Sequence, residues 1–242
     1  MNYNRSAKEL QQSGFARLKQ LGHKYVIGVD EVGYGSWAGP VVVCAALVRA
    51  GWRDVRIKDS KKYGSGSEGR ARREAAARLL TSDVILLRRL LQYDRDVIDQ
   101  YGVNKARNML VVQAVMYCLE EQPGTPVVMD GNQLPDELIG KALCFPKADL
   151  LVPAVSAASV MAKVYRDRLM ERQHEEYPWY DFASNAGYGS LTHEEGILEH
   201  GLCPIHRRSY RNIKQFAARE SQGRLAVARL KEWQRQHNVT PG

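Results

Sequence analysis

Apolar positions along the chain fall into short runs and longer periodic stretches that alternate. Runs of about 4–8 apolar or β-branched residues, bounded by glycine, proline or polar turns, are typical of buried strands. Three such runs predict strands at residues 25–32, 41–48 and 84–91, and two shorter apolar runs predict strands at residues 127–129 and 143–145. Strands that alternate with helices predict an α/β fold built on one sheet.

Apolar residues at helical spacing predict helices between and around these strands, at residues 2–22, 70–80, 104–119, 153–176 and 213–237. Pro153 suits the first turn of a helix, where its missing N–H has no partner to lose. Residues 59–69 (DSKKYGSGSEG) are rich in glycine, serine and lysine. That composition predicts an exposed, mobile loop.

The pattern divides the chain into three parts. We expect a helical extension at residues 1–24, an α/β core at residues 25–176 and a part made of helices and loops at residues 177–242. The last part begins where aromatic residues and glycines become interleaved, after Tyr177. We expect a monomer.

Composition narrows the class of protein. The longest apolar runs are far shorter than the roughly 20 residues that cross a bilayer, and the amino-terminal stretch lacks the pattern of a secretory signal. The four cysteines are far apart and lack zinc-ligand spacing, so we expect free thiols in a reducing, cytoplasmic compartment. A formal net charge of +8 favours a polyanionic partner.

Candidate chemistry begins with an acid pair, Asp30 and Glu31, at the end of the first predicted strand. Neighbouring strand residues point to opposite faces, so both acids reach one site only where the strand ends or bulges. The plainer interpretation is two solvated acids. Gly33, Gly35 and Gly39 follow, and backbone without Cβ atoms allows a phosphodiester chain to approach closely.

Two further acids follow short apolar stretches. Asp130 comes directly after the fourth predicted strand, and Asp149 lies just before the helix that begins near Pro153. Either alone is typical of a turn. The four acids together could cluster at one end of the sheet, where carboxylate oxygens would suit a pair of Mg²⁺ or Mn²⁺ ions that cleave phosphodiesters.

The residues 29–43 (VDEVGYGSWAGPVVV) resemble the hallmark segment of the ribonuclease HII family. Four further blocks occur in the family's order: residues 59–61 (DSK), 129–131 (MDG), 147–167, and 187–189 (GYG) followed by His193 and residues 206–210. The resemblance spans about residues 25–210. It implies a ribonuclease H-like mixed five-stranded sheet flanked by helices, with a carboxy-terminal helical part.

The resemblance implies an endonuclease that cuts RNA in RNA/DNA hybrids and ribonucleotides embedded in DNA, leaving 5′-phosphate and 3′-hydroxyl ends. It assigns two Mg²⁺ or Mn²⁺ ions to Asp30, Glu31, Asp130 and Asp149. Asp167 is a rival for the fourth position. Because it lies within a helix between two arginines, we favour an ion pair at i, i+4 or nearby for it.

The resemblance also implies contacts to the substrate. It matches Tyr188 to a tyrosine that packs on the sugar beside the ribonucleotide, and Lys61 and Lys163 to lysines near bound phosphates. Without the resemblance, Tyr188 could equally be a residue that anchors its loop. Lys61 and Lys163 would then be solvated surface lysines. His206–Arg208 could also touch the nucleic-acid backbone, although a structural role is equally open for His206. The basic closing helix is either a solvated face or a source of nonspecific phosphate contacts.

One position departs from the family. Gly33-Tyr34-Gly35 stands where the family has Gly-Arg-Gly, the element that reads a 2′-hydroxyl at an RNA-to-DNA junction. Both glycines remain for backbone hydrogen bonds, but the arginine charge is lost. We therefore expect weaker excision of single embedded ribonucleotides. Two alternatives stay open: a nucleic-acid-binding relative without activity, and a metal-dependent DNA nuclease or strand-transfer enzyme on the same fold.

Overall fold

The computed structural model describes residues 22–57, 63, 64 and 66–218. The helix predicted at residues 2–22 lies outside this range except for its last residue. Lys61 and most of the predicted closing helix also lie outside it, although the described residues 211–218 are helical. No helix in the described ranges is long and apolar enough to cross a membrane.

The core is a five-stranded mixed sheet, as predicted. Its strands are β1 (Tyr25–Val32), β2 (Val41–Arg49), β3 (Ile85–Tyr93), β4 (Val127–Asp130) and β5 (Ala142–Phe145), in the order β3-β2-β1-β4-β5. β2 pairs antiparallel with both β1 and β3, whereas β4 runs parallel to both β1 and β5. β1 and β4 therefore end side by side at the same edge of the sheet.

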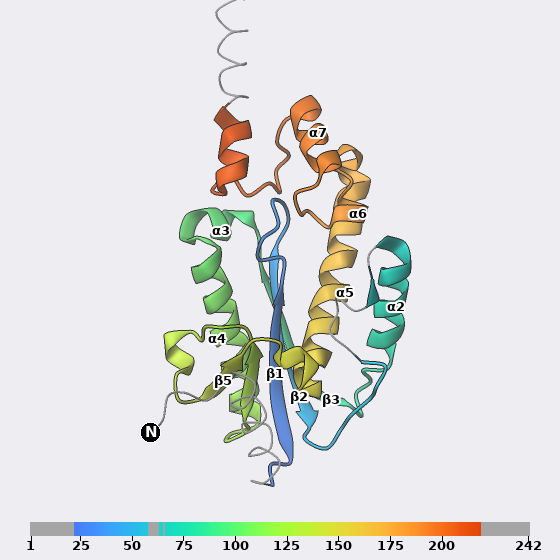
Figure 1. The fold of residues 1–242 in the computed structure, drawn as a ribbon. Coiled ribbons are helices and arrows are strands. Elements are labelled where there is room, and N and C mark those ends of the chain that lie inside the picture. The colour runs from blue at the N-terminus through green and yellow to red at the C-terminus, as the bar shows by residue number, and fades with distance from the viewer. Residues whose placement is uncertain (1–21, 58–62, 65, 219–242) are drawn as a thin grey trace, which may run out of the picture.

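Helices cover both faces of this sheet (Figure 1). α4 (Val103–Glu121) packs on one face, and α5 (Pro153–Glu176) with α2 (Gly66–Arg78) packs on the other. The first eight residues of β2 are all buried, because a central strand has a helix layer on either side. Burial on both faces explains why its sequence is a continuous apolar run.

Two elements differ from the sequence-based predictions. α2 begins at Gly66, so the end of the segment predicted as an exposed loop is helical, and Tyr63 is buried. Arg73 explains this difference, because its guanidinium donates to the Gly64 carbonyl at 2.8 Å and holds the chain against the core. The short helix α3 (Arg95–Tyr101) was not predicted. Gly102, at φ +80°, separates it from α4.

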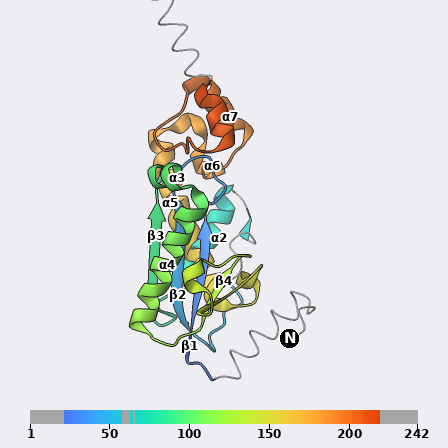
Figure 2. The ribbon, with the colours of Figure 1, turned by 90° about the vertical axis from the view of Figure 1, so that its left-hand side faces the viewer.

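The carboxy-terminal part is helical, as predicted, and has its own small core. Its described residues contain a 3-10 turn (Pro178–Tyr180), α6 (Phe182–Asn185) and α7 (Leu191–His200). Tyr180, Phe182 and Ile197 pack there against Met170 of α5. Figures 1 and 2 both place this part at one end of the molecule, next to the loop between β1 and β2.

Backbone hydrogen bonds join that loop to the carboxy-terminal part. The amide of Trp37 donates to the Gly187 carbonyl at 2.8 Å, and the amide of Gly39 donates to the Ile205 carbonyl at 3.0 Å. The loop after the acid pair is thus bonded to residues more than 140 positions away in the sequence.

Candidate active site

Asp30 and Glu31 occupy consecutive positions in β1, opposite Cys44 and Val43 of β2. The register is unbroken, so no bulge turns the two acids to one side, and β1 ends one residue later at Val32. Asp30 faces α5, where the Ser159 hydroxyl bonds its carboxylate. Glu31 faces α4. Because β1 ends one residue later, both carboxylates lie at the end of the strand, one on the side of each helix layer.

Negative charge is concentrated around Asp30. Burial raises the pKa of Asp30 well above its usual range, and the charges of Glu31 and Asp130 raise it further. Neighbouring carboxylates repel one another when ionised. A bound cation would relieve this repulsion, so the three acids at the adjoining ends of β1 and β4 fit a divalent metal site in charge and in donor type.

Ala148 connects Asp130 to the turn that contains Asp149. The Ala148 amide donates to Oδ1 of Asp130 at 2.8 Å. Asp149 follows in a single 3-10 turn, Ala148–Leu150, and is buried with 6% of its surface exposed. Its carbonyl accepts a hydrogen bond from Ser156 of α5. Asp149 therefore directly follows the residue whose amide bonds Asp130.

The described part of the chain contains no three His, Cys, Asp or Glu side chains already grouped as metal ligands. The fit of these acids to a divalent ion therefore rests on the carboxylate chemistry and on the repulsion centred on Asp30.

Sequence reasoning missed Arg107. This residue of α4 is buried, and its guanidinium donates to Oε2 of Glu31 and to the Gln133 carbonyl, each at 3.3 Å. It also donates to Asn108 at 2.9 Å. The available signal was an arginine on the apolar face of a predicted helix, next to Ala106 and one turn before Leu110 and Val111. Arg107 supplies positive charge at the edge of the acidic site.

Two fully buried arginines hold the Gly33–Gly39 loop. Arg166 donates to the carbonyls of Pro40 (2.9 Å), Ala186 (2.8 Å) and Ala38 (3.2 Å) and to the Ser36 hydroxyl (2.8 Å). A Cβ on Gly33, which has φ +84°, would lie 2.2 Å from Nε of Arg166. Only glycine fits at this position.

The second buried arginine is Arg207. It donates to the carbonyls of Gly39 and Tyr34, both at 2.9 Å. His206 is also fully buried. The prediction that these two residues could touch a nucleic-acid backbone is therefore wrong: their side chains are used to hold the protein's own backbone.

The side chain of Tyr34 is exposed while its backbone is fixed. Its ring is 40% exposed, and its hydroxyl donates to the Asn104 side chain at the start of α4. Gly35 has open space around its Cα, so a ligand can approach the backbone there. Residues 33–35 thus present one open glycine, Gly35, and one exposed aromatic ring beside the acid pair, whereas Gly33 is buried.

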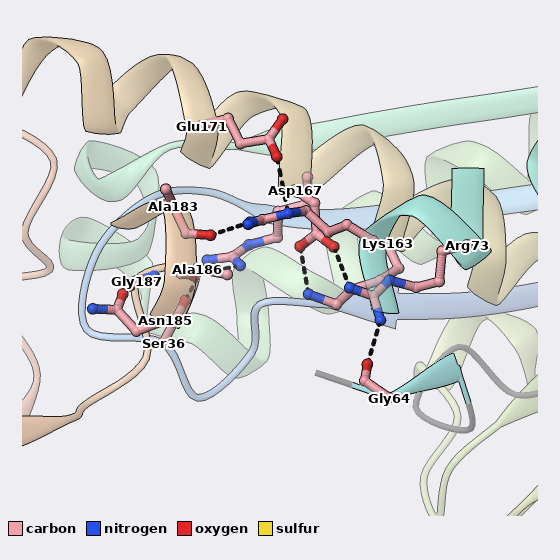
Figure 3. A network of polar contacts seen from close by, with 12 residues as sticks. Ser36, Gly64, Arg73, Lys163, Asp167, Glu171, Ala183, Asn185, Ala186 and Gly187 are labelled. Carbon is pink, nitrogen blue, oxygen red and sulfur yellow. Dashed lines mark hydrogen bonds and ion pairs between the residues drawn. The ribbon is translucent and has the colours of Figure 1, made fainter. Parts of the chain in front are cut away.

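Tyr188 and Lys163 line a cleft that is separate from the four acids. The ring of Tyr188 is 39% exposed and packs over the guanidinium of Arg166. Lys163 pairs with Asp167 one turn later in α5. Asp167 also binds Arg73 at 3.0 Å (Figure 3). The predicted i, i+4 ion pair of Asp167 is confirmed.

This arrangement of strands and helices is similar to that of solved ribonuclease structures. The crystal structure of the ribonuclease H2 from Pyrococcus horikoshii OT3 has a TM-score of 0.60 over 81% of this chain and 98% of that one, at 24% identity. The crystal structure of Bst-RNase HIII in complex with Mn2+ has a TM-score of 0.63 over 83% of this chain and 71% of that one, at 20% identity. The fold is therefore of the ribonuclease H class.

The sequence identifies the family of the protein, whereas the fold shows only its class. The sequence model of the family described as Ribonuclease HII matches residues 27–213. A Ribonuclease HII of Listeria monocytogenes is 37% identical over 198 residues, which cover 82% of this chain and 72% of that protein. The chain belongs to the ribonuclease HII family, and the prediction of a ribonuclease H enzyme is confirmed.

Proposed function

We propose that this protein hydrolyses the RNA strand of RNA/DNA hybrids and also cuts DNA duplexes at embedded ribonucleotides. The observation that carries the proposal is the crowding of Asp30 by Glu31 and Asp130 at the ends of two adjacent strands. Membership of the ribonuclease HII family supports the substrate class. Cleavage adds water to phosphorus and breaks the P–O3′ bond, which leaves 5′-phosphate and 3′-hydroxyl ends.

The acids Asp30, Glu31, Asp130 and Asp149 would hold two Mg²⁺ or Mn²⁺ ions, and a structural neighbour described as a complex with Mn2+ is consistent with this. Such ions activate water and stabilise the charge on the departing oxygen. Arg107 fixes the carboxylate of Glu31 and balances part of the negative charge. The Ala148 amide orients Asp130.

Substrate recognition would come from the loop and the cleft on either side of the acids. The backbone at Gly33 and Gly35 would bond the 2′-hydroxyl, which distinguishes RNA from DNA. The exposed ring of Tyr188 would pack on the sugar, and Lys163 and Lys61 would contact phosphates. Tyr34 brings no charge to this loop, so single embedded ribonucleotides would be cut less efficiently than longer RNA tracts.

The same proposal places the enzyme in the cytoplasm as a monomer. Residues 25–176 would form the catalytic core, and residues 177–242 would complete the substrate groove through Tyr188. Residues 1–24 would be an accessory extension.

The test is cleavage by purified full-length protein of three labelled duplexes: an RNA/DNA hybrid, DNA with one ribonucleotide, and DNA alone. Each is incubated with Mg²⁺, Mn²⁺ or EDTA. We expect metal-dependent cutting of the first two, faster on the hybrid, with DNA spared. Binding without cutting would show an inactive relative, and cutting of all-DNA duplex would show a DNA nuclease.

A further inference from the structure

A cleft of about 340 Å³ lies beside Tyr188, between the first turns of α2, the middle of α5 and the segment 184–188. Three cationic side chains line it, those of Arg70, Arg73 and Lys163, against a single carboxylate, that of Asp167. Three cations against one anion leave an excess of two positive charges in the lining, and an excess of one when Glu171, which pairs with Arg70, is counted. An excess of this sign beside the proposed sugar contact favours an anionic group as the occupant.

Asp167 holds two of these cations in place (Figure 3). One carboxylate oxygen binds Lys163, and the other binds Arg73 at 3.0 Å. The side chains of Asp167 and Arg73 are each 6% exposed, whereas that of Lys163 is 20% exposed. Burial lowers the pKa of Lys163, and Asp167 opposes this effect. An ammonium has three N–H donors, so Lys163 retains donors for a ligand.

Arg70 is held at the same cleft from another direction. Its guanidinium donates to the Ala183 carbonyl and pairs with Glu171 at 2.9 Å (Figure 3). The side chain of Arg70 is 21% exposed, and that of Glu171 is 42% exposed. A guanidinium has five N–H donors arranged as a fork. These two partners leave donors of Arg70 available at the cleft.

We propose that Arg70 is a further contact to the substrate: together with Lys163, it binds the backbone phosphate next to the nucleotide at Tyr188 in this cleft. The inference rests on the proposed function, because the phosphate belongs to that substrate. Glu171 competes with the phosphate for Arg70. Arg70 is a substrate contact that the sequence motifs do not indicate.

The first test measures binding of the full-length protein to a labelled RNA/DNA hybrid in EDTA at several KCl concentrations. Arg70→Gln should weaken binding about fivefold at moderate salt and reduce the slope of log K against log salt by about one. Arg72→Gln is the matched control. It removes the same charge from the same helix, at an exposed residue paired with Glu68 outside the cleft, and should bind almost as the wild type does.

Glu171→Gln separates phosphate binding from a purely structural role of the Arg70–Glu171 pair. If Arg70 binds phosphate, removing its competitor should tighten hybrid binding about twofold. If the pair only supports the fold, both substitutions should weaken binding. Arg70→Lys keeps the charge and should restore the salt slope. Thermal melting of each variant establishes that it is folded.

An equal salt slope for Arg70→Gln and Arg72→Gln, or weaker binding by Glu171→Gln, would overturn the proposal. These measurements use no metal, so they are independent of cleavage. Failure of the wild-type protein to cut the hybrid would refute the proposed function instead.

Discussion

Asp130 ends β4 with one carboxylate oxygen already bonded to the Ala148 amide. An asparagine can accept the same hydrogen bond, so Asp130→Asn should remove the charge and leave the fold intact. Loss of even an outer-shell partner costs a metal site about 10- to 100-fold in activity. We therefore expect cleavage of the hybrid to fall at least about 100-fold, measured as kcat in Mg²⁺.

The matched control is Asp136→Asn, which removes the same charge from an exposed residue in a 3-10 turn. This variant should cleave as the wild type does. Full activity of a folded Asp130→Asn protein would contradict the role assigned to Asp130.

Tyr34 stands where the sequence resemblance implies an arginine, and its exposed side chain leaves room for a longer one. Tyr34→Arg should restore a charged hydrogen bond to a phosphate, worth about 1.5–3 kcal/mol. We expect kcat/KM for DNA with one ribonucleotide to rise about 10-fold or more relative to that for the hybrid. Tyr34→Phe is the control, because it removes the hydrogen bond to Asn104 without adding a charge. An unchanged ratio of the two kcat/KM values in Tyr34→Arg would exclude this explanation of specificity.

At the scale of elements, the packing of α5 on β1 depends on Gly28. A Cβ at this position would lie 2.0 Å from the backbone carbon of Ala154, closer than any real contact. Gly28→Ala should therefore push α5 away from β1 and lower the free energy of unfolding by at least about 2 kcal/mol. Urea denaturation measures the change.

Gly51→Ala is the control for Gly28→Ala, because nothing lies within 4 Å of the Cβ it would add. Its effect should stay within about 0.5 kcal/mol of the wild-type value. Because α5 carries Ser159 and begins beside Asp149, displacement of the helix should also reduce activity. Equal stability of the two variants would show that α5 has room to move.

For the whole molecule, a buried histidine pair lies within the carboxy-terminal part, where the backbone of His206 pairs with that of Ala38 in the loop after β1. Nδ1 of His193 lies 2.9 Å from the Tyr188 carbonyl and therefore carries a proton. Its Nε2 then accepts from Nε2 of His206 at 3.0 Å. Nδ1 of His206 accepts from the Cys203 amide, also at 3.0 Å. Both rings are neutral in this network, and a further proton on either would set two N–H groups against each other.

Stability should therefore fall in acid. Burial lowers the pKa of His193, and burial together with His193 lowers the pKa of His206 to about 3. The unfolded chain takes up these protons near pH 6.5. The stabilisation from His206 is thus complete above about pH 6.5 and is lost as the pH falls toward 3, by about 1.4 kcal/mol per pH unit, and His193 contributes in the same direction.

Urea denaturation at several pH values between 7 and 4.5 tests this dependence. His206→Gln should lower stability at pH 7 and flatten its dependence on pH. His200→Gln, at the end of α7, should leave the dependence unchanged. A slope that is the same in the wild type and in His206→Gln would show that other groups govern acid unfolding.

The sequence by itself determined the sheet and its principal helices, since continuous apolar runs and helical spacing reflect local periodicity. β1 and α5 begin and end where the pattern predicted, and the motifs identified the family. Local pattern carries no information about distant partners. It therefore missed the buried role of Arg107 and left a nucleic-acid contact open for His206 and Arg207, which are buried.

Only the tertiary structure decided which residues meet. The Gly64 carbonyl turns toward the core because Arg73, in the helix that follows, donates to it. The Gly33–Gly39 loop is held by Arg166 and Arg207, which lie more than 120 positions along the chain. Burying such charges is stabilising only when distant backbone carbonyls satisfy them. That condition depends on the folded arrangement, so no local pattern of residues encodes it.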